Sequence, residues 1–202
     1  MKYLKCCFAA FCSGGFCSGG FCSGAFCFAA CCFAAALALS GCHGKSERVL
    51  GEGANYHVGA GYPRSFRLSD GSTVLVLPNT TVATAKGFGR DNRDLDVDGE
   101  VMIEVSGAAG PPFVVHTRDL VIEVLQGGAR FHVDANRARP GEETDLLEGR
   151  LRVRKSYHSD TDNEVEELGG GEMVMINRDI DLMEKEKLSP AELDKVKEKV
   201  GN

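Results

Sequence analysis

Cysteine and tryptophan are what most of this sequence lacks. All nine cysteines lie at or before residue 42, and the 202-residue chain contains no tryptophan. The cysteine-free remainder excludes a disulfide framework, a cysteine-based zinc site and a cysteine nucleophile in residues 43–202. Only four tyrosines are present, so the chain has few aromatic rings on which a carbohydrate-binding surface could stack sugars.

Acidic residues are absent from the N-terminal segment. Before residue 42 the only charged residues are Lys2 and Lys5, and their removal takes the formal net charge from −6 to −8. An acidic remainder argues against a nucleic-acid partner, because phosphate binding needs a basic surface.

The N-terminal segment has the pattern of a secretory signal. Its two lysines precede residues 6–38, which consist only of Ala, Phe, Cys, Gly, Ser and Leu and repeat the pentad Phe-Cys-Ser-Gly-Gly. Such a stretch before a small-residue site indicates a cleaved signal. The following Leu39, Ser40, Gly41 and Cys42 resemble the lipobox of bacterial lipoproteins. The resemblance implies cleavage after Gly41 and a lipid on Cys42.

Two other interpretations of this segment stay open. It is long enough to cross a bilayer, which takes about 20 apolar residues, although its glycines and serines lower helix propensity. A zinc or disulfide role is disfavoured because the five-residue cysteine spacing has no His or carboxylate among it. We therefore expect a signal peptide at 1–41 and a lipoprotein facing the periplasm. His43 is not an acidic retention residue, so the outer membrane is favoured and the leaflet stays open.

The chain behind the signal changes character near Arg64. Residues 42–63 are glycine-rich without sustained periodicity and are interpreted as a lipid anchor and flexible tether. Residues 64–176 show short alternating runs broken by turn residues, which predicts an all-β domain. The hairpin dipeptide Asp70-Gly71 separates the first two runs, and Asp98-Gly99 interrupts a third. We expect strands within residues 65–68, 73–77, 93–105, 112–117, 119–125, 129–135, 145–155 and 165–176.

Residues 177–202 are expected to be a tail with one short helix. Ser189, Pro190 and Glu192 have the spacing of an N-cap, a first helical proline and a capping-box acid. A thin apolar stripe of Leu193, Val196 and Val200 follows. A helix of about 12 residues is marginal alone in water, so it must dock on the β domain, bind a partner or fray.

Two rows of like charge alternate with apolar residues and are the candidate interaction residues: Asp94, Asp96 and Asp98, and Arg150, Arg152 and Arg154. The aspartates also fit the start of an EF-hand loop, but its twelfth position is Val105 rather than a bidentate glutamate. Alternation with Leu95 and Val97 favours a strand with one polar face. We hypothesise that the arginine row lies near the aspartate row, because like charges on one face repel unless countered.

No catalytic constellation is visible. The histidines at 57, 116, 132 and 158 include no H-x-H pair, and those at 116 and 132 fall inside expected strands. No nucleophile is paired with a base and no G-x-S-x-G elbow is present. We expect no enzyme activity, no metal site and no cofactor.

Six blocks of the expected β domain resemble, in order, the periplasmic domain of the FecR family: LSDGSTVLVL (68–77), RDLDVDGEVMIEV (93–105), PFVVHT (112–117), VLQGGARFHV (124–133), LEGRLRV (147–153) and LGGGE (168–172). The fourth block carries extra residues relative to the family pattern. The resemblance implies stacked β-hairpins in a roll or solenoid-like architecture.

Two departures from the family pattern limit what the resemblance implies about function. Only five residues precede the apolar segment, so we expect no cytoplasmic domain that holds a sigma factor. The 26 residues after Ile176 are too few for a further transporter-binding domain. We expect a non-catalytic envelope lipoprotein whose domain acts in protein interaction or signal transduction, with strand addition as one binding mode. The alternatives are a component of a transport-linked sigma/anti-sigma pathway and a structural or ligand-binding surface lipoprotein.

Overall fold

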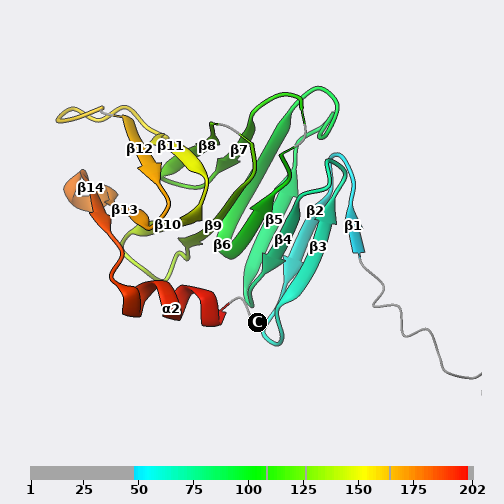
Figure 1. Cartoon of the computed structure of the whole chain (residues 1–202), viewed down its shortest axis with the longest axis horizontal. Coiled ribbons are helices and arrows are strands. Elements are labelled where there is room, and N and C mark those ends of the chain that lie inside the picture. The colour runs from blue at the N-terminus through cyan, green and yellow to red at the C-terminus, as the bar shows by residue number, and fades with distance from the viewer. Residues whose placement is uncertain (1–47, 108, 126, 164, 200–202) are drawn as a thin grey trace, which may run out of the picture. The chain divides into compact units, whose positions relative to one another are not determined.

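The computed structural model describes residues 48–107, 109–125, 127–163 and 165–199 (Figure 1). Residues 1–41, which are expected to be a signal peptide, and Cys42 lie outside these residues. The expected all-β fold with one short C-terminal helix is confirmed. The elements are β1 (Arg48–Leu50), β2 (Asn55–Val58), β3 (Arg64–Leu68), β4 (Thr73–Val76), β5 (Thr80–Thr84), β6 (Arg93–Val105), β7 (Phe113–His116), β8 (Leu120–Val124), β9 (Ala129–Ala135), β10 (Glu142–Glu148), β11 (Arg150–Lys155), β12 (Val165–Gly169), β13 (Glu172–Asn177), the 3-10 turn η1 (Arg178–Ile180), β14 (Leu182–Lys187) and α2 (Pro190–Lys199).

The strands form two sheets that share β6. Sheet A runs β1-β3-β4-β6-β9-β10-β13-β14, and sheet B runs β2-β5-β6-β7-β8-β11-β12. The first half of β6 pairs with β5 and β7, and its second half pairs with β4 and β9. Only the β1–β3 and β6–β7 ladders are parallel among these pairs. The short hairpin turns in the sequence join consecutive strands, which therefore pair in antiparallel orientation.

Gly99 marks the point where β6 passes from sheet B to sheet A. Its φ is +122°, and a Cβ there would lie 2.8 Å from the Thr80 Cα atom and also meet the Thr80 hydroxyl. That hydroxyl accepts a hydrogen bond from the Glu100 N–H at 2.9 Å. Asp98-Gly99 is therefore a bend within one strand, where only glycine leaves room for the crossing chain.

One hydrophobic core lies between the two sheets, because alternate side chains of both sheets point inward. The largest fully buried members are Phe66, Leu68, Ile103, Phe131, Leu146 and Ile176 from sheet A and Leu95, Phe113, Leu120, Ile122, Leu151 and Leu168 from sheet B. Tyr56 packs edge-on against Phe66 with ring centroids 4.4 Å apart. We call the opposite, core-averted side of each sheet its outer face.

The β domain begins earlier than the sequence pattern predicted. The segment 48–58, expected to be part of the tether, forms β1 and β2, which pair with β3 and β5. Leu50 and Val58 are buried there. Strands of three and four residues inside a glycine-rich segment are too short to show a period, so tertiary pairing alone defines them. The strands β5 and β14 were not expected either.

The C-terminal segment is an integral part of the domain. Strand β14 pairs with β13, and α2 has the predicted capping box, since the Ser189 N–H donates to Glu192 Oε2 at 2.8 Å. Leu188 and Val196 are buried, so of the three options for the helix, docking is the one observed. No helix within the described ranges is long and apolar enough to cross a membrane.

Candidate functional site

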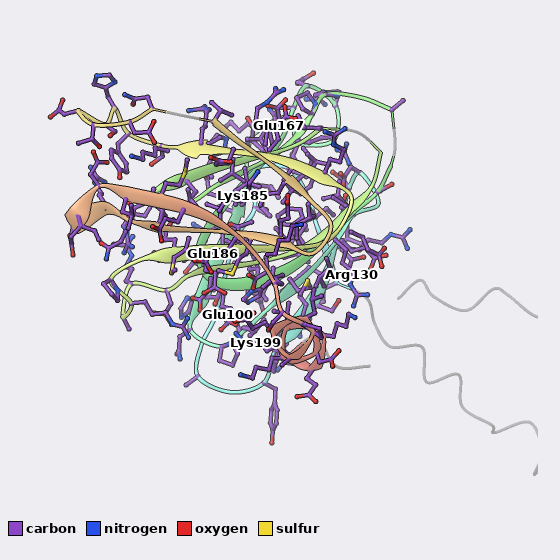
Figure 2. The ribbon with its side chains drawn as sticks, turned by 60° about the vertical axis from the view of Figure 1, so that its left-hand side comes forward. Glu100, Arg130, Glu167, Lys185, Glu186 and Lys199 are labelled. Carbon is purple, nitrogen blue, oxygen red and sulfur yellow. The ribbon has the colours of Figure 1, made fainter. Side chains whose placement is uncertain are left out.

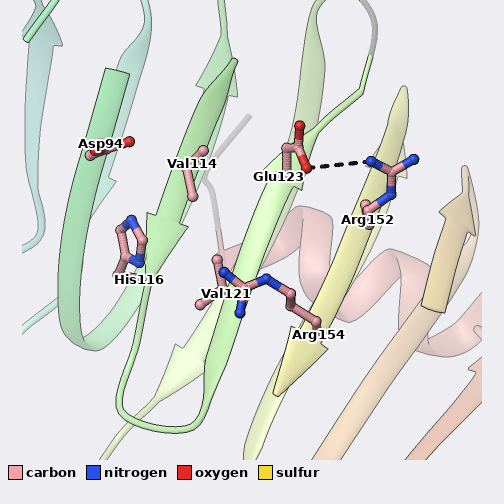
Figure 3. A pocket seen from close by; sticks show the side chains of 7 residues that line it. All are labelled: Asp94, Val114, His116, Val121, Glu123, Arg152 and Arg154. Carbon is pink, nitrogen blue, oxygen red and sulfur yellow. Dashed lines mark ion pairs between the residues drawn. The ribbon is translucent and has the colours of Figure 1, made fainter. Parts of the chain in front are cut away.

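Two parallel rows of side chains cross the outer face of sheet B. The strand registers place them in order from β5 or β6 to β12: Ala83, Asp96, His116, Val121, Arg154 and Val165 in the first row, and Asp94, Val114, Glu123, Arg152 and Glu167 in the second. Every member is a cross-strand neighbour of the next and shares its side of the sheet. No helix covers these rows among the described residues, and α2 lies behind the sheet (Figure 3).

The centre of this face is a shallow groove of about 250 Å³ over β6, β7, β8 and β11. Figure 3 shows the Arg154 side chain extending over Val121 toward His116. The floor is formed by Val114 and Val121, and charged groups stand on both sides. Arg152 bridges Glu123 at 3.6 Å and Glu167 at 3.1 Å. The groove is therefore a small apolar strip between charges rather than an enclosed cavity.

Three charges on this face have no ion-pair partner within the described part of the chain: Asp94, Asp96 and Arg154. The Arg154 guanidinium donates a 3.5 Å hydrogen bond to the Lys155 carbonyl. Asp98, in contrast, is paired with Arg137 at 2.9 Å. Exposed ion pairs contribute only about 0–1 kcal/mol, so the unpaired charges cost the folded protein little and stay available to a partner.

The aspartates of β6 and the arginines of β11 share the outer face of sheet B, but they do not neutralise one another. Strands β7 and β8 lie between β6 and β11. The aspartates of β6 are therefore about 14 Å from the arginines of β11, at about 4.8 Å per strand. The counter-ions of Arg152 are Glu123 of β8 and Glu167 of β12, and Arg150 reaches Glu167 at 3.5 Å, whereas Arg154 has none among the described residues. The hypothesis that the aspartates counter the arginines is therefore wrong, because strand order could not be read from the sequence.

Asp94, Asp96 and Asp98 lie on one face of strand β6. Leu95 and Val97 are buried between the aspartates, and no group of three or more His, Cys, Asp or Glu side chains that could hold a metal ion occurs among the residues that the structure describes. The histidines at 57, 116 and 158 come from β2, β7 and the loop after β11. The EF-hand spacing thus coincides with a strand rather than a loop.

The outer face of sheet A carries a buried polar network centred on His132. Its Nδ1 lies 2.9 Å from Asp145 Oδ2 and its Nε2 lies 2.9 Å from Glu100 Oε1. Lys199 of α2 reaches the same Glu100 oxygen at 2.7 Å (Figure 2). Burial lowers the pKa of His132, but the hydrogen bonds to the two carboxylates outweigh it and raise the pKa to about 9. The network stabilises the docked helix with an imidazolium held between two acids.

Sequence reasoning missed this network. The sequence pattern predicted only that His132 lies inside a strand, and in the structure 2% of its side chain is exposed. Glu100, His132 and Asp145 come from β6, β9 and β10. The sequence shows only that each of these three polar residues is next to an apolar residue in its strand. Whether they contact one another depends on the strand register, which the sequence does not give.

Other buried charges anchor loops. Arg93 pairs with Asp70 of the first hairpin at 2.7 Å, and its guanidinium also donates to the Ser106 carbonyl at 2.9 Å. The Lys155 ammonium donates to Asp181 Oδ1 at 3.0 Å and to the Asp162 carbonyl at 2.9 Å. Hydrogen bonds from Ser159 and neighbouring groups lower the pKa of Asp181. Each group is satisfied by its neighbours, so these clusters stabilise loops rather than form an open site.

Comparisons with known proteins address the fold and the family. Residues 54–152 match the family model described as FecR protein. Two crystal structures of proteins from Parabacteroides distasonis ATCC 8503, provisionally described as anti-sigma factors, are similar. One has a TM-score of 0.63 at 23% identity and covers 73% of this chain and 64% of its own. The other has a TM-score of 0.59 at 24% identity and covers 67% and 60%. The chain thus spans less than two thirds of either neighbour, and at this identity the likeness shows the shared fold. The comparison with curated proteins gave no match.

Proposed function

Residues 54–152 form a FecR-family domain, and from this premise we propose that the protein is a non-catalytic regulatory module of the cell envelope. It binds a protein partner through the outer face of sheet B. The description of both solved neighbours as anti-sigma factors supports a regulatory role. A link to a sigma-factor pathway is one form that this role takes.

The observation that carries the proposal is the difference between the two outer faces. On sheet A, Met102, His132 and Asp145 are buried, and α2 is tied to that side through Lys199 and Glu100. On sheet B, unpaired carboxylates and an unpaired guanidinium flank an apolar strip. Exposed charges around an apolar centre give a partner both orientation and contact area.

The face is a better docking surface than the neighbouring sheet edges. Strand β14 carries alternating Glu and Lys over Glu184–Lys187, a pattern that blocks edge-to-edge pairing. The Glu167 carbonyl of β12 accepts a hydrogen bond from the Lys185 ammonium at 3.3 Å. Because these edges are charged or occupied, strand addition is disfavoured there.

We further propose that the domain is attached to the membrane by lipid. The lipobox resemblance of residues 39–42 supports cleavage after Gly41 and acylation of Cys42, and the short segment between Cys42 and β1 then serves as the tether. More than one acyl chain anchors durably, whereas a single chain binds membrane marginally. This arrangement keeps the regulatory domain within reach of envelope partners.

Complementation of a deletion strain with charge-reversed full-length chains tests the docking face. The test variant combines Asp94→Lys, Asp96→Lys and Arg154→Glu. The matched control combines Glu184→Lys, Glu186→Lys and Lys187→Glu on exposed β14, with the same net charge change. We expect the control to restore the transcript levels that the deletion changes and the test variant to leave them unrestored. Full restoration by both chains would contradict the proposed face.

A further inference from the structure

The first row on the outer face of sheet B carries opposite charges at equal distances from its midpoint. From the β5 end it presents an alanine, an acid and a histidine, and from the β12 end it presents a valine, an arginine and a valine: Ala83, Asp96 and His116, then Val165, Arg154 and Val121. The midpoint falls between β7 and β8. Asp96 on one side therefore has Arg154 at the same distance on the other side.

Such a row is complementary to itself. A two-fold axis parallel to the strands and midway between β7 and β8 maps β6 of one copy onto β11 of another. It places Asp96 opposite Arg154 of the second copy, and the reciprocal pair forms at the same time, as in any isologous interface. The same rotation places Asp94 of the second row opposite Arg152. Strands of the two copies then run nearly in line, which is the common aligned packing of two sheets.

We propose, resting on the proposed function of this face, that its partner is a second copy of the same chain. The pairing gives a counter-ion to the unpaired Asp96 and Arg154. It also places Ala83 against Val165, whose side chain is 49% exposed on the edge strand β12. His116 meets Val121 next to the axis. One two-fold rotation thus forms both the apolar contacts and the ion pairs of the row.

The size of the face predicts a weak dimer. Six strands from β5 to β12 at about 4.8 Å each, and about five residues along each strand, give roughly 450 Å² per copy. A stable complex buries about 800 Å² per partner. Self-association is therefore transient in solution, and attachment of both copies to one membrane raises their effective concentration.

Site-specific photo-crosslinking in membranes tests the proposal with the full chain. Val114→benzoylphenylalanine places the crosslinker in the groove, and Met175→benzoylphenylalanine places it on the other sheet at a side chain that is 42% exposed. Two copies with different C-terminal tags are co-expressed, and the yield of the doubly tagged dimer is measured. We expect a dimer from position 114 and none from position 175.

Charge exchange identifies the contact. With Asp96→Arg in both copies, or Arg154→Asp in both copies, like charges oppose each other and the dimer yield should fall about tenfold or more. One Asp96→Arg copy co-expressed with one Arg154→Asp copy should restore the yield, since both contacts again join opposite charges. Restoration also shows that both variants are folded.

Three results would overturn the inference: no dimer from position 114 in the unaltered chain, a dimer that survives either reversal, or no restoration in the mixed pair. A crosslinked product of a different mass at position 114 overturns self-association but leaves the face as a docking surface. The absence of any product at position 114 contradicts the proposed docking face as well.

Discussion

Raising the pH from 6 to 9.5 should destabilise the β domain through His132. In the folded chain its pKa is about 9, against an ordinary value of 6.5. Below pH 6.5 the imidazole is charged in both states and its stabilisation is complete. Between pH 6.5 and 9 only the folded state holds the proton, so stability falls as the pH rises, and above 9 the contribution is lost.

The magnitude follows from the pKa change. An increase of the pKa from 6.5 to about 9 corresponds to about 3 kcal/mol. For a domain of this size that is a large part of a total stability of about 5–15 kcal/mol. Glu100 contributes on the acid side, because its hydrogen bond from His132 lowers its pKa to about 2. That contribution is present above pH 4.5 and is lost as the pH falls toward 2.

Urea denaturation between pH 6 and 9.5 measures the effect on a chain that begins at Ser46, since Ser46–Asn202 form one compact unit. Glu100→Gln removes one of the two carboxylates and should reduce the loss to about half, roughly 1.5 kcal/mol. Glu104→Gln, at an exposed position on the same strand, is the matched control and should keep the full loss. Equal pH dependence in both variants would refute the assigned role of His132.

Three further outcomes are expected. Gly99→Ala should cost about 2 kcal/mol or more in urea denaturation, because the new Cβ meets Thr80 at a positive φ, whereas Gly59→Ala, with open space around it, should stay within about 0.5 kcal/mol. Val196→Asp places a charge at a buried position of α2 and should speed amide hydrogen exchange throughout that helix; unchanged exchange would show that docking does not depend on this side chain. Cys42→Ala should abolish incorporation of labelled palmitate, and an unaltered protein that starts at Met1 with unmodified Cys42 in mass spectrometry would refute the lipid anchor.

Strand positions were predictable where large apolar residues alternate over a run of more than four residues, whereas β5 was missed because two of its three buried residues, Thr80 and Thr84, are polar. Strands β6 and β9 and the hairpin at Asp70-Gly71 lie where the sequence pattern put them. The short strands β1 and β2 were not predictable, because a period of two is not distinguishable over three or four residues in a glycine-rich segment. The charged strand β14 was missed for a different reason, since it has little apolar alternation and is specified by its pairing with β13.

Local pattern was enough to predict the class of fold, the family resemblance, the capped helix and the apolar side of the longer alternating strands. These features depend on neighbours within a few residues, where spacing and side-chain chemistry are directly readable. Two arrangements followed from the three-dimensional structure alone: β7 and β8 separate Asp96 from Arg154, and His132 lies between Glu100 and Asp145. Both arrangements depend on strand order and register, which are fixed when the shared core is buried between the two sheets.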